Sequence, residues 1–175
     1  MFLIYQLLLT LVILISPFII IVRILKGKED IKRFKEKFCL FSKKRHRGKI
    51  LWFHGSSVGE IMSAIPLINK YDKVNYFSQI LVTSSTLSSS KILQKYKFKK
   101  VTHQYFPIDH IFFSNFFINY WKPNISIFLE SEIWPSMFES IKKRSIPLVL
   151  LNARVTKNSF NRWLKLKNFS KSIFN

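Results

Sequence analysis

Several of the few acidic residues in this chain fall where a ligand site would form. Of nine Asp and Glu residues, Glu60 follows the apolar run 50–54, and Glu130 follows the apolar run 125–129. Asp109 lies in a comparable place, after the run 101–105. A carboxylate can take a proton from a reacting group or accept hydrogen bonds from a ligand. These acids are therefore candidates for general-base or ligand-binding chemistry.

Glu60 is the first candidate because of the segment that leads to it, His-Gly-Ser-Ser-Val-Gly-Glu at 54–60. Small residues there leave backbone amides free and give a ligand room to approach. The glycine spacing and the missing Lys-Ser/Thr pair exclude a Walker loop and a dinucleotide fingerprint. A Glu in the first turn of a helix often only caps it or offsets its dipole. The residues alone therefore leave a structural and a catalytic role open.

Other polar residues extend this candidate set. Asn152 and Arg154 follow the apolar run 148–151. Arginine suits bidentate contacts with phosphate, so Arg154 is a candidate for binding a phosphate group. An ion pair with one of the glutamates is the alternative role for Arg154.

The sequence predicts neither a metal site nor a cofactor. His46, His103 and His110 have no metal-ligand spacing with each other or with the carboxylates. Cys39 is the single cysteine, which excludes an intramolecular disulfide and a Cys-based metal site. His54, at the end of the first apolar run, is expected to be a hydrogen-bonded structural residue.

Short apolar runs alternate with longer mixed stretches after residue 48, which predicts right-handed βαβ units and a parallel sheet. The fold class is therefore α/β, with a Rossmann-like parallel sheet. The expected strands are 50–54, 79–83, 101–105, 125–129 and 148–151, and the expected helices are 58–71, 89–96, 111–120 and 135–144.

Residues 1–22 contain no charged side chain and predict a membrane anchor helix. Such a helix is about 33 Å long, which suits a bilayer core of about 30 Å. The cations that follow, Arg23, Lys26 and Lys28, favour a cytoplasmic location for the rest of the chain. A buried helix, or an interfacial one kinked at Pro17, is the alternative.

The segment 23–48 is basic, and the whole chain has a formal charge of +20. Two interpretations remain open for this segment: a basic amphipathic helix on the membrane surface, or a solvated linker. The charge also raises the hypothesis of nucleic-acid binding. That activity needs base-stacking aromatics on a basic face, whereas the aromatics here lie mostly in strands and apolar runs, so no nucleic-acid partner is expected.

Five ordered sequence blocks resemble the 3-deoxy-manno-octulosonate (Kdo) transferases that glycosylate lipid A, and the resemblance covers almost the whole chain. The blocks are Trp52-Phe53-His54 with Ser57-Val58-Gly59-Glu60; Ile80-Leu81-Val82-Thr83 with Thr86; Pro107 with Asp109; Glu130-Ser131-Glu132-Ile133-Trp134-Pro135; and Pro147 through Asn152-Ala153-Arg154 to Ser159.

The resemblance implies the N-terminal, acceptor-side half of a GT-B glycosyltransferase, truncated before its donor domain. The implied reaction transfers Kdo from CMP-Kdo to a lipid A precursor with inversion and without a metal. Glu60 would be the general base, and the implied acceptor-binding residues are Ser57, Gly59, Thr86, Asp109, Glu130, Asn152 and Arg154. Glu132 would be structural, as a cap of the following helix.

The implied organisation has four parts: a membrane anchor at 1–22, a basic juxtamembrane segment at 23–48, a Rossmann-like domain at 49–160, and a helical linker at 161–175 towards an absent donor domain. The expected location is the inner membrane, with a separately encoded donor domain as a partner. A catalytically inactive remnant, with at most membrane or lipid binding, is the alternative.

Overall fold

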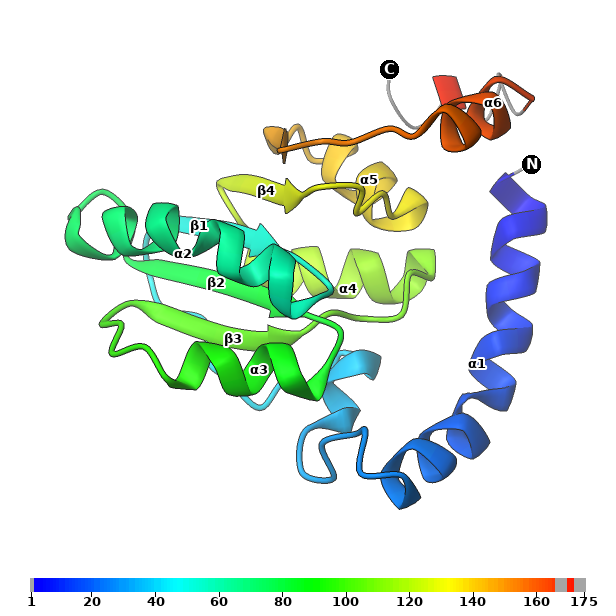
Figure 1. Ribbon diagram of the computed structural model, residues 1–175, viewed down its shortest axis with the longest axis horizontal. Coiled ribbons are helices and arrows are strands. Elements are labelled where there is room, and N and C mark those ends of the chain that lie inside the picture. The colour runs from blue at the N-terminus through cyan, green and yellow to red at the C-terminus, as the bar shows by residue number, and fades with distance from the viewer. Residues whose placement is uncertain (1, 166–169, 172–175) are drawn as a thin grey trace.

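Five parallel strands form the centre of the computed structural model, which describes residues 2–165 and 170–171 (Figure 1). The strands lie in the order β3-β2-β1-β4-β5. Their bounds are β1 (Ile50–His54), β2 (Gln79–Ser84), β3 (Val101–Tyr105), β4 (Ile125–Leu129) and β5 (Leu148–Leu151). Because all neighbouring strands are parallel, their carboxyl ends lie together along one side of the sheet.

Helices cover both faces of this sheet. On one face lie α2 (Val58–Lys73) and α3 (Leu87–Gln94), and on the other lie α4 (Ile111–Trp121) and α5 (Pro135–Lys142). Alternate residues of β1 divide the core accordingly: Trp52 packs towards α4 and α5, while Phe53 packs towards α2. The side chains of β1 thus contribute to the core on both faces of the sheet, and the helices of the βαβ units cover each face.

The sequence prediction of a Rossmann-like α/β fold is confirmed, and the expected strands match the observed ones apart from one added residue at the end of β2. β1, β2 and most of β4 are buried on both faces. Apolar runs without alternation are typical of such doubly covered strands. The helices differ from the predicted ranges only at their ends.

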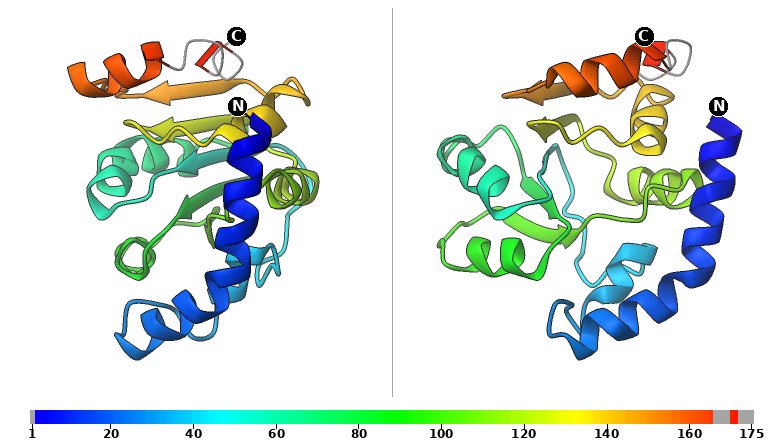
Figure 2. Two further views of the ribbon diagram at one scale, coloured as in Figure 1. Left: turned by 90° about the vertical axis from the view of Figure 1, so that its right-hand side faces the viewer. Right: turned by 45° about the vertical axis from the view of Figure 1, so that its right-hand side comes forward.

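The N-terminal helix α1 (Phe2–Leu25) stands beside the edge at which the strands end (Figures 1 and 2). In the described part of the chain it is the one helix long and apolar enough to cross a membrane, a finding that rests on length and composition alone. At the other end of the chain, α6 (Lys157–Lys165) follows β5. Residues 166–169 and 172–175 of the predicted linker lie outside the described residues.

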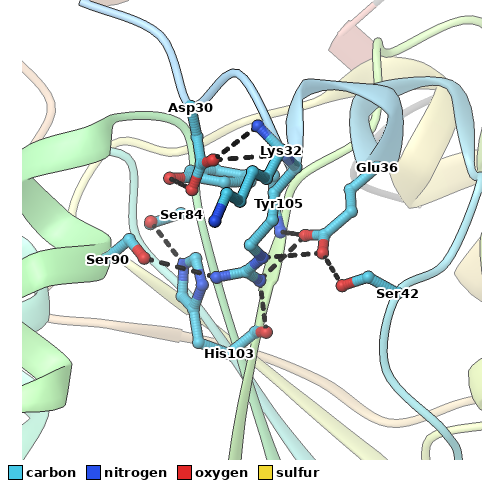
Figure 3. A network of polar contacts seen from close by, with 9 residues as sticks. Asp30, Lys32, Glu36, Ser42, Ser84, Ser90, His103 and Tyr105 are labelled. Atoms are coloured by element: carbon cyan, nitrogen blue, oxygen red, sulfur yellow. Dashed lines mark hydrogen bonds and ion pairs between the residues drawn. The ribbon is translucent and has the colours of Figure 1, made fainter.

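The segment between α1 and β1 folds onto the sheet edge at β3, through the 3-10 helix η1 (Phe34–Phe38). Arg33 donates to both carboxylate oxygens of Glu36, at 2.8 and 2.9 Å, and to the carbonyl oxygen of His103 at 2.8 Å (Figure 3). Glu36 is buried and also accepts from the amide of Tyr105 at 2.9 Å. The segment is therefore neither a continuous amphipathic helix nor a solvated linker.

Candidate functional site

Glu60 lies in the first turn of α2, where its carboxylate is held by two donors. The amide of Ser56 donates to Oε2 at 2.7 Å, and the hydroxyl of Ser57 donates to Oε1 at 2.7 Å. Ser57 is the N-cap of α2, and its oxygen accepts from the amide of Glu60 at 3.2 Å. This reciprocal arrangement is a variant of the capping box. Glu60 thus takes part in the cap of α2.

Gly55 brings this turn close to the neighbouring strand. A Cβ atom at Gly55 would lie 2.9 Å from Leu129 Cδ1 and 3.0 Å from Glu60 Cβ. Glycine is therefore required by the close approach of β1, β4 and α2, and this approach sets the position of the Glu60 side chain.

Ser56 joins three of the loops that follow the strands. Its hydroxyl donates to Oε2 of Glu132, after β4, and lies 3.2 Å from the hydroxyl of Ser85, after β2. Its carbonyl oxygen accepts from the hydroxyl of Ser89 at 3.2 Å. Because its amide also binds Glu60, a single residue positions both carboxylates of the site.

Glu132 is the second carboxylate of this cluster. Besides Ser56, it accepts a 2.8 Å bond from the indole Nε1 of Trp134, and its Oε2 lies 3.3 Å from Nε2 of His54. Burial would raise the pKa of Glu132, but the contacts with His54, Ser56 and Trp134 outweigh burial and lower it. Glu132 is therefore a carboxylate already supplied with donors from the protein.

His54 is fully buried and packs on Phe106, with ring centroids 3.8 Å apart. Its Nδ1 lies 2.9 Å from Oγ1 of Thr83. Burial lowers the pKa of His54, and the neighbouring Glu132 opposes this only in part. The histidine is therefore neutral near pH 7 and orients the loops instead of carrying charge, as expected for a structural residue.

Asp109 lies away from this cluster, at the N-terminal ends of α4 and α5. It is buried and accepts bonds from the amide of Ser136 at 3.1 Å, the amide of Met137 at 2.8 Å and the hydroxyl of Tyr5 at 2.7 Å. Burial raises the pKa of Asp109 to about 6, although these donors act in the opposite direction. Its contacts favour a structural role over contact with an acceptor.

The other predicted acceptor-binding residues divide into two groups. Thr86 is the N-cap of α3, with Oγ1 accepting from the amide of Ser89 at 3.2 Å, and is thus used structurally, as Ser57 is. Gly59 is exposed on the first turn of α2, beside Glu60.

Glu130, Asn152 and Arg154 form the second group, with side chains that have no hydrogen bond or ion pair among residues 2–165 and 170–171. Glu130 and Asn152 directly follow β4 and β5 and have φ values of 53° and 56°. The amide of Glu130 donates to the carbonyl oxygen of Leu151 at 2.8 Å, so the two loops lie side by side. Left-handed backbone is uncommon outside glycine and often marks functional loops.

The sequence interpretation missed Ser56 as the junction of the site. It treated the serine as one of several small residues, although a hydroxyl two positions beyond a strand is well placed to reach a neighbouring loop. Within the described ranges, no group of three or more His, Cys, Asp or Glu side chains is arranged to hold a metal ion.

A parallel sheet with polar side chains at the carboxyl ends of its strands defines a Rossmann-like ligand-binding domain. The family model of 3-deoxy-D-manno-octulosonic-acid transferase (kdotransferase) matches residues 32–175. The chain therefore belongs to the Kdo transferase family, and its sheet is the N-terminal domain of that GT-B family.

Curated relatives agree with this assignment. The chain is 43% identical over 155 residues to 3-deoxy-D-manno-octulosonic acid transferase of Rickettsia bellii, which covers 89% of this chain and 37% of the relative. It is 32% identical over 225 residues to the enzyme of the same name from Rickettsia typhi, covering 99% of this chain and 48% of the relative. The Haemophilus influenzae enzyme of that name is 32% identical over 117 residues, covering 67% of this chain and 27% of the relative. The chain thus spans less than half the length of these relatives.

Proposed function

We propose that this chain is the acceptor-binding half of a glycosyltransferase that transfers Kdo from CMP-Kdo to a lipid A precursor in lipopolysaccharide biosynthesis. The reaction inverts the anomeric carbon and uses no metal or other cofactor. The observation that supports this best is the junction at Ser56, which holds two carboxylates at the carboxyl edge of the sheet in a chain of this family.

Glu60 is the general base in this proposal. Each of its oxygens accepts one hydrogen bond from the protein, from Ser56 or Ser57. Since a carboxylate oxygen has two lone pairs, each keeps one for an incoming hydroxyl. Ser57 and Gly59 are exposed, so the acceptor can approach from solvent. Glu132 is a weaker candidate because its contacts with His54, Ser56 and Trp134 lower its pKa and so make it a weaker base.

Glu130, Asn152 and Arg154 bind the acceptor in this proposal. The side chains lie after neighbouring strands and have no partner in the described part of the chain. A glutamate suits sugar hydroxyl groups, and an arginine suits a phosphate of the lipid A precursor.

The donor CMP-Kdo is held mainly by a region of the relatives that this chain does not match. Turnover therefore requires that region as well. The proposed location is the cytoplasmic face of the inner membrane, with α1 as the anchor.

The test mixes membranes containing this chain with the unmatched portion of the Rickettsia bellii relative and measures Kdo transfer from CMP-Kdo to a lipid A precursor. Glu60→Gln keeps an acceptor for the capping bonds but cannot take a proton, so we expect turnover to fall by about 10²- to 10⁴-fold. Glu139→Gln is the matched control, because Glu139 is a partly exposed helix residue paired with Lys143 at 3.3 Å.

Full turnover by Glu60→Gln would remove Glu60 from the mechanism. Binding of the lipid A precursor without turnover, in the unaltered chain with this or any other donor domain, would favour the alternative of an inactive remnant.

A further inference from the structure

The N-terminal end of α1 is bound to the globular domain. Tyr5 donates to Asp109 at 2.7 Å, and Gln6 Nε2 donates to the hydroxyl of Ser136 at 2.7 Å. The amide of Ile111 donates to Gln6 Oε1 at 3.0 Å. Two consecutive polar side chains thus meet the first turns of α4 and α5.

The C-terminal end of α1 is bound to the same body. Arg23 Nε lies 2.8 Å from Glu29 Oε2, and Lys37 Nζ lies 2.6 Å from the same oxygen. Glu29 is buried, and Lys37 belongs to η1, which packs against β3. Both ends of the helix are therefore held by one domain.

Exposure along α1 follows the helical repeat. The less exposed positions recur every three or four residues, at Phe2, Tyr5, Leu9, Ile13, Ser16 and Ile20. Apart from Thr10 and Pro17, every exposed residue of α1 is apolar, including Leu3, Leu7, Leu11, Leu14, Phe18, Ile21 and Leu25. One stripe of the helix thus faces the protein along its length, and an apolar surface faces outwards.

A transmembrane orientation conflicts with this arrangement. A helix of 24 residues is about 36 Å long, and a spanning helix places its ends on opposite sides of a core of about 30 Å. Arg23 would then lie on one side of the bilayer with Glu29, while Tyr5 would lie on the other side. To keep its contact with Tyr5, Asp109 and the polar ends of α4 and α5 would have to reach that far side. Buried polar groups of this kind are not accommodated in lipid.

We propose that α1 does not cross the membrane but lies in its plane, with its outer face in the acyl region of a leaflet rich in anionic phospholipid. Interfacial helices usually combine an apolar face with a polar one. In this chain the domain takes the place of the polar face. Pro17, Thr10 and the apolar surface enter the lipid as one side of a larger membrane-binding face.

Neighbouring residues complement such a surface in charge and polarity. Phe112 and Phe116 are exposed on α4, whose first amide is bound to Gln6. Exposed lysines follow the C-terminal end of α1, at Lys26, Lys28, Lys32 and Lys35. Cations next to an apolar face favour anionic head groups over a second protein surface.

This orientation also affects the proposed active site, and that part rests on the proposed function. α1 lies on the side of the sheet at which the strands end (Figure 1), and Glu60 and Glu130 follow two of those strands. An acceptor lipid with its acyl chains in the same leaflet would present its sugar to this edge. The position of α1 itself can be tested without any turnover.

The first experiment cross-links Gln6→Cys with Phe112→Cys in membranes, using a short bismaleimide, because Gln6 accepts from the amide of Ile111 and the neighbouring Phe112 is 63% exposed. Cys39 is buried, at 3% exposure, so the native thiol stays in place. Gln6→Cys with Lys70→Cys is the matched control, because Lys70 is exposed near the C-terminal end of α2, at the opposite edge of the sheet. We expect the 6–112 product and no 6–70 product, in membranes from which the chain is extracted only by detergent.

The second experiment places an epitope tag before Met1 and adds protease to spheroplasts and to inverted membrane vesicles. An in-plane helix leaves the tag on the cytoplasmic side, protected in spheroplasts and digested in inverted vesicles. Digestion in spheroplasts, together with loss of the 6–112 product, would show a spanning helix and overturn the proposal.

The third experiment measures flotation of the full chain with vesicles of phosphatidylethanolamine and phosphatidylglycerol. Lys28→Gln and Lys32→Gln should each weaken binding by about fivefold. A chain that stays unbound and dimerises through α1 would identify a second copy as the occupant of this face and refute a lipid-binding role.

Discussion

The hydroxyl of Tyr5 donates a 2.7 Å hydrogen bond to Asp109, although 104 positions separate the two residues in the sequence. Asp109 also accepts from two backbone amides at the start of α5. One buried carboxyl group thus connects the N-terminal helix, the loop after β3 and a helix of the domain. Its protonation should affect the stability of all three.

We first predict a pH dependence from Asp109. Burial raises its pKa from 3.8 to about 6, so the folded state binds this proton more tightly than the unfolded state does. The free energy of unfolding should therefore gain a contribution as pH falls from about 6 towards 4, on the order of 3 kcal/mol. Asp109→Asn lacks this contribution. Urea unfolding in detergent at both pH values, compared between the two proteins, measures it, and equal pH dependence would contradict the prediction.

The second prediction concerns Ser57, which caps α2 and binds the carboxylate of Glu60. Ser57→Ala should lower the free energy of unfolding by about 1 kcal/mol and also reduce Kdo transfer, because Glu60 loses a donor. Thr156→Ala is the control, since Thr156 Oγ1 likewise accepts from the amide of Ser159, at 3.2 Å. The thermal stability of Thr156→Ala should fall by a similar amount without a change in turnover. An equal loss of transfer in both variants would show that the effect is only structural.

The third prediction compares two glycines in one segment. Gly55→Ala should destabilise the domain by about 1–3 kcal/mol, because the new methyl group meets Leu129 and Glu60 at 2.9 and 3.0 Å. Gly59→Ala should be neutral or stabilising by up to about 1 kcal/mol, since Gly59 is helical and its nearest contact would be Ser57 Oγ at 3.9 Å. Chemical unfolding of both variants provides the test. Similar values for the two would disprove the tight approach at Gly55.

The fourth prediction concerns the ion pair of Arg33 with Glu36 in Figure 3. Arg33→Ala should cost about 3–5 kcal/mol because it leaves the buried carboxylate of Glu36 without its cation. Arg33→Lys should recover only part of this, since Lys cannot reproduce the two parallel bonds. Lys143→Ala breaks the more exposed pair with Glu139 and should cost less than about 1 kcal/mol. A small effect at Arg33 would mean that the 23–48 segment is not anchored to β3.

The sheet could be predicted from the sequence because its strands are buried on both faces. Ile50–His54 and Ile125–Leu129 are apolar runs of strand length, bounded by polar or turn-forming residues. The helix ends were predicted less accurately: the helix predicted at 89–96 begins two residues earlier, at Leu87. Thr86 caps that helix, a role that the sequence interpretation did not predict.

Long-range polar contacts could not be predicted in the same way. Asp109 and Glu130 both follow strands, yet Asp109 is buried by donors from α1 and α5, whereas the Glu130 side chain has no partner within the described residues. Distance along the chain gives no indication of such partners. Glu29 and Glu36 lie in a segment that the sequence analysis described only as basic, although each is a buried carboxylate paired with at least one cation.

The contacts at the N-terminal end of α1 also impose an order of events during synthesis. Gln6 leaves the ribosome 130 residues before its partner Ser136. At about 5–20 residues per second, that interval lasts on the order of ten seconds. The apolar helix is complete throughout this time while the surface that covers its inner stripe does not yet exist. Nascent chains should therefore meet lipid, or a chaperone, before α1 meets its own domain.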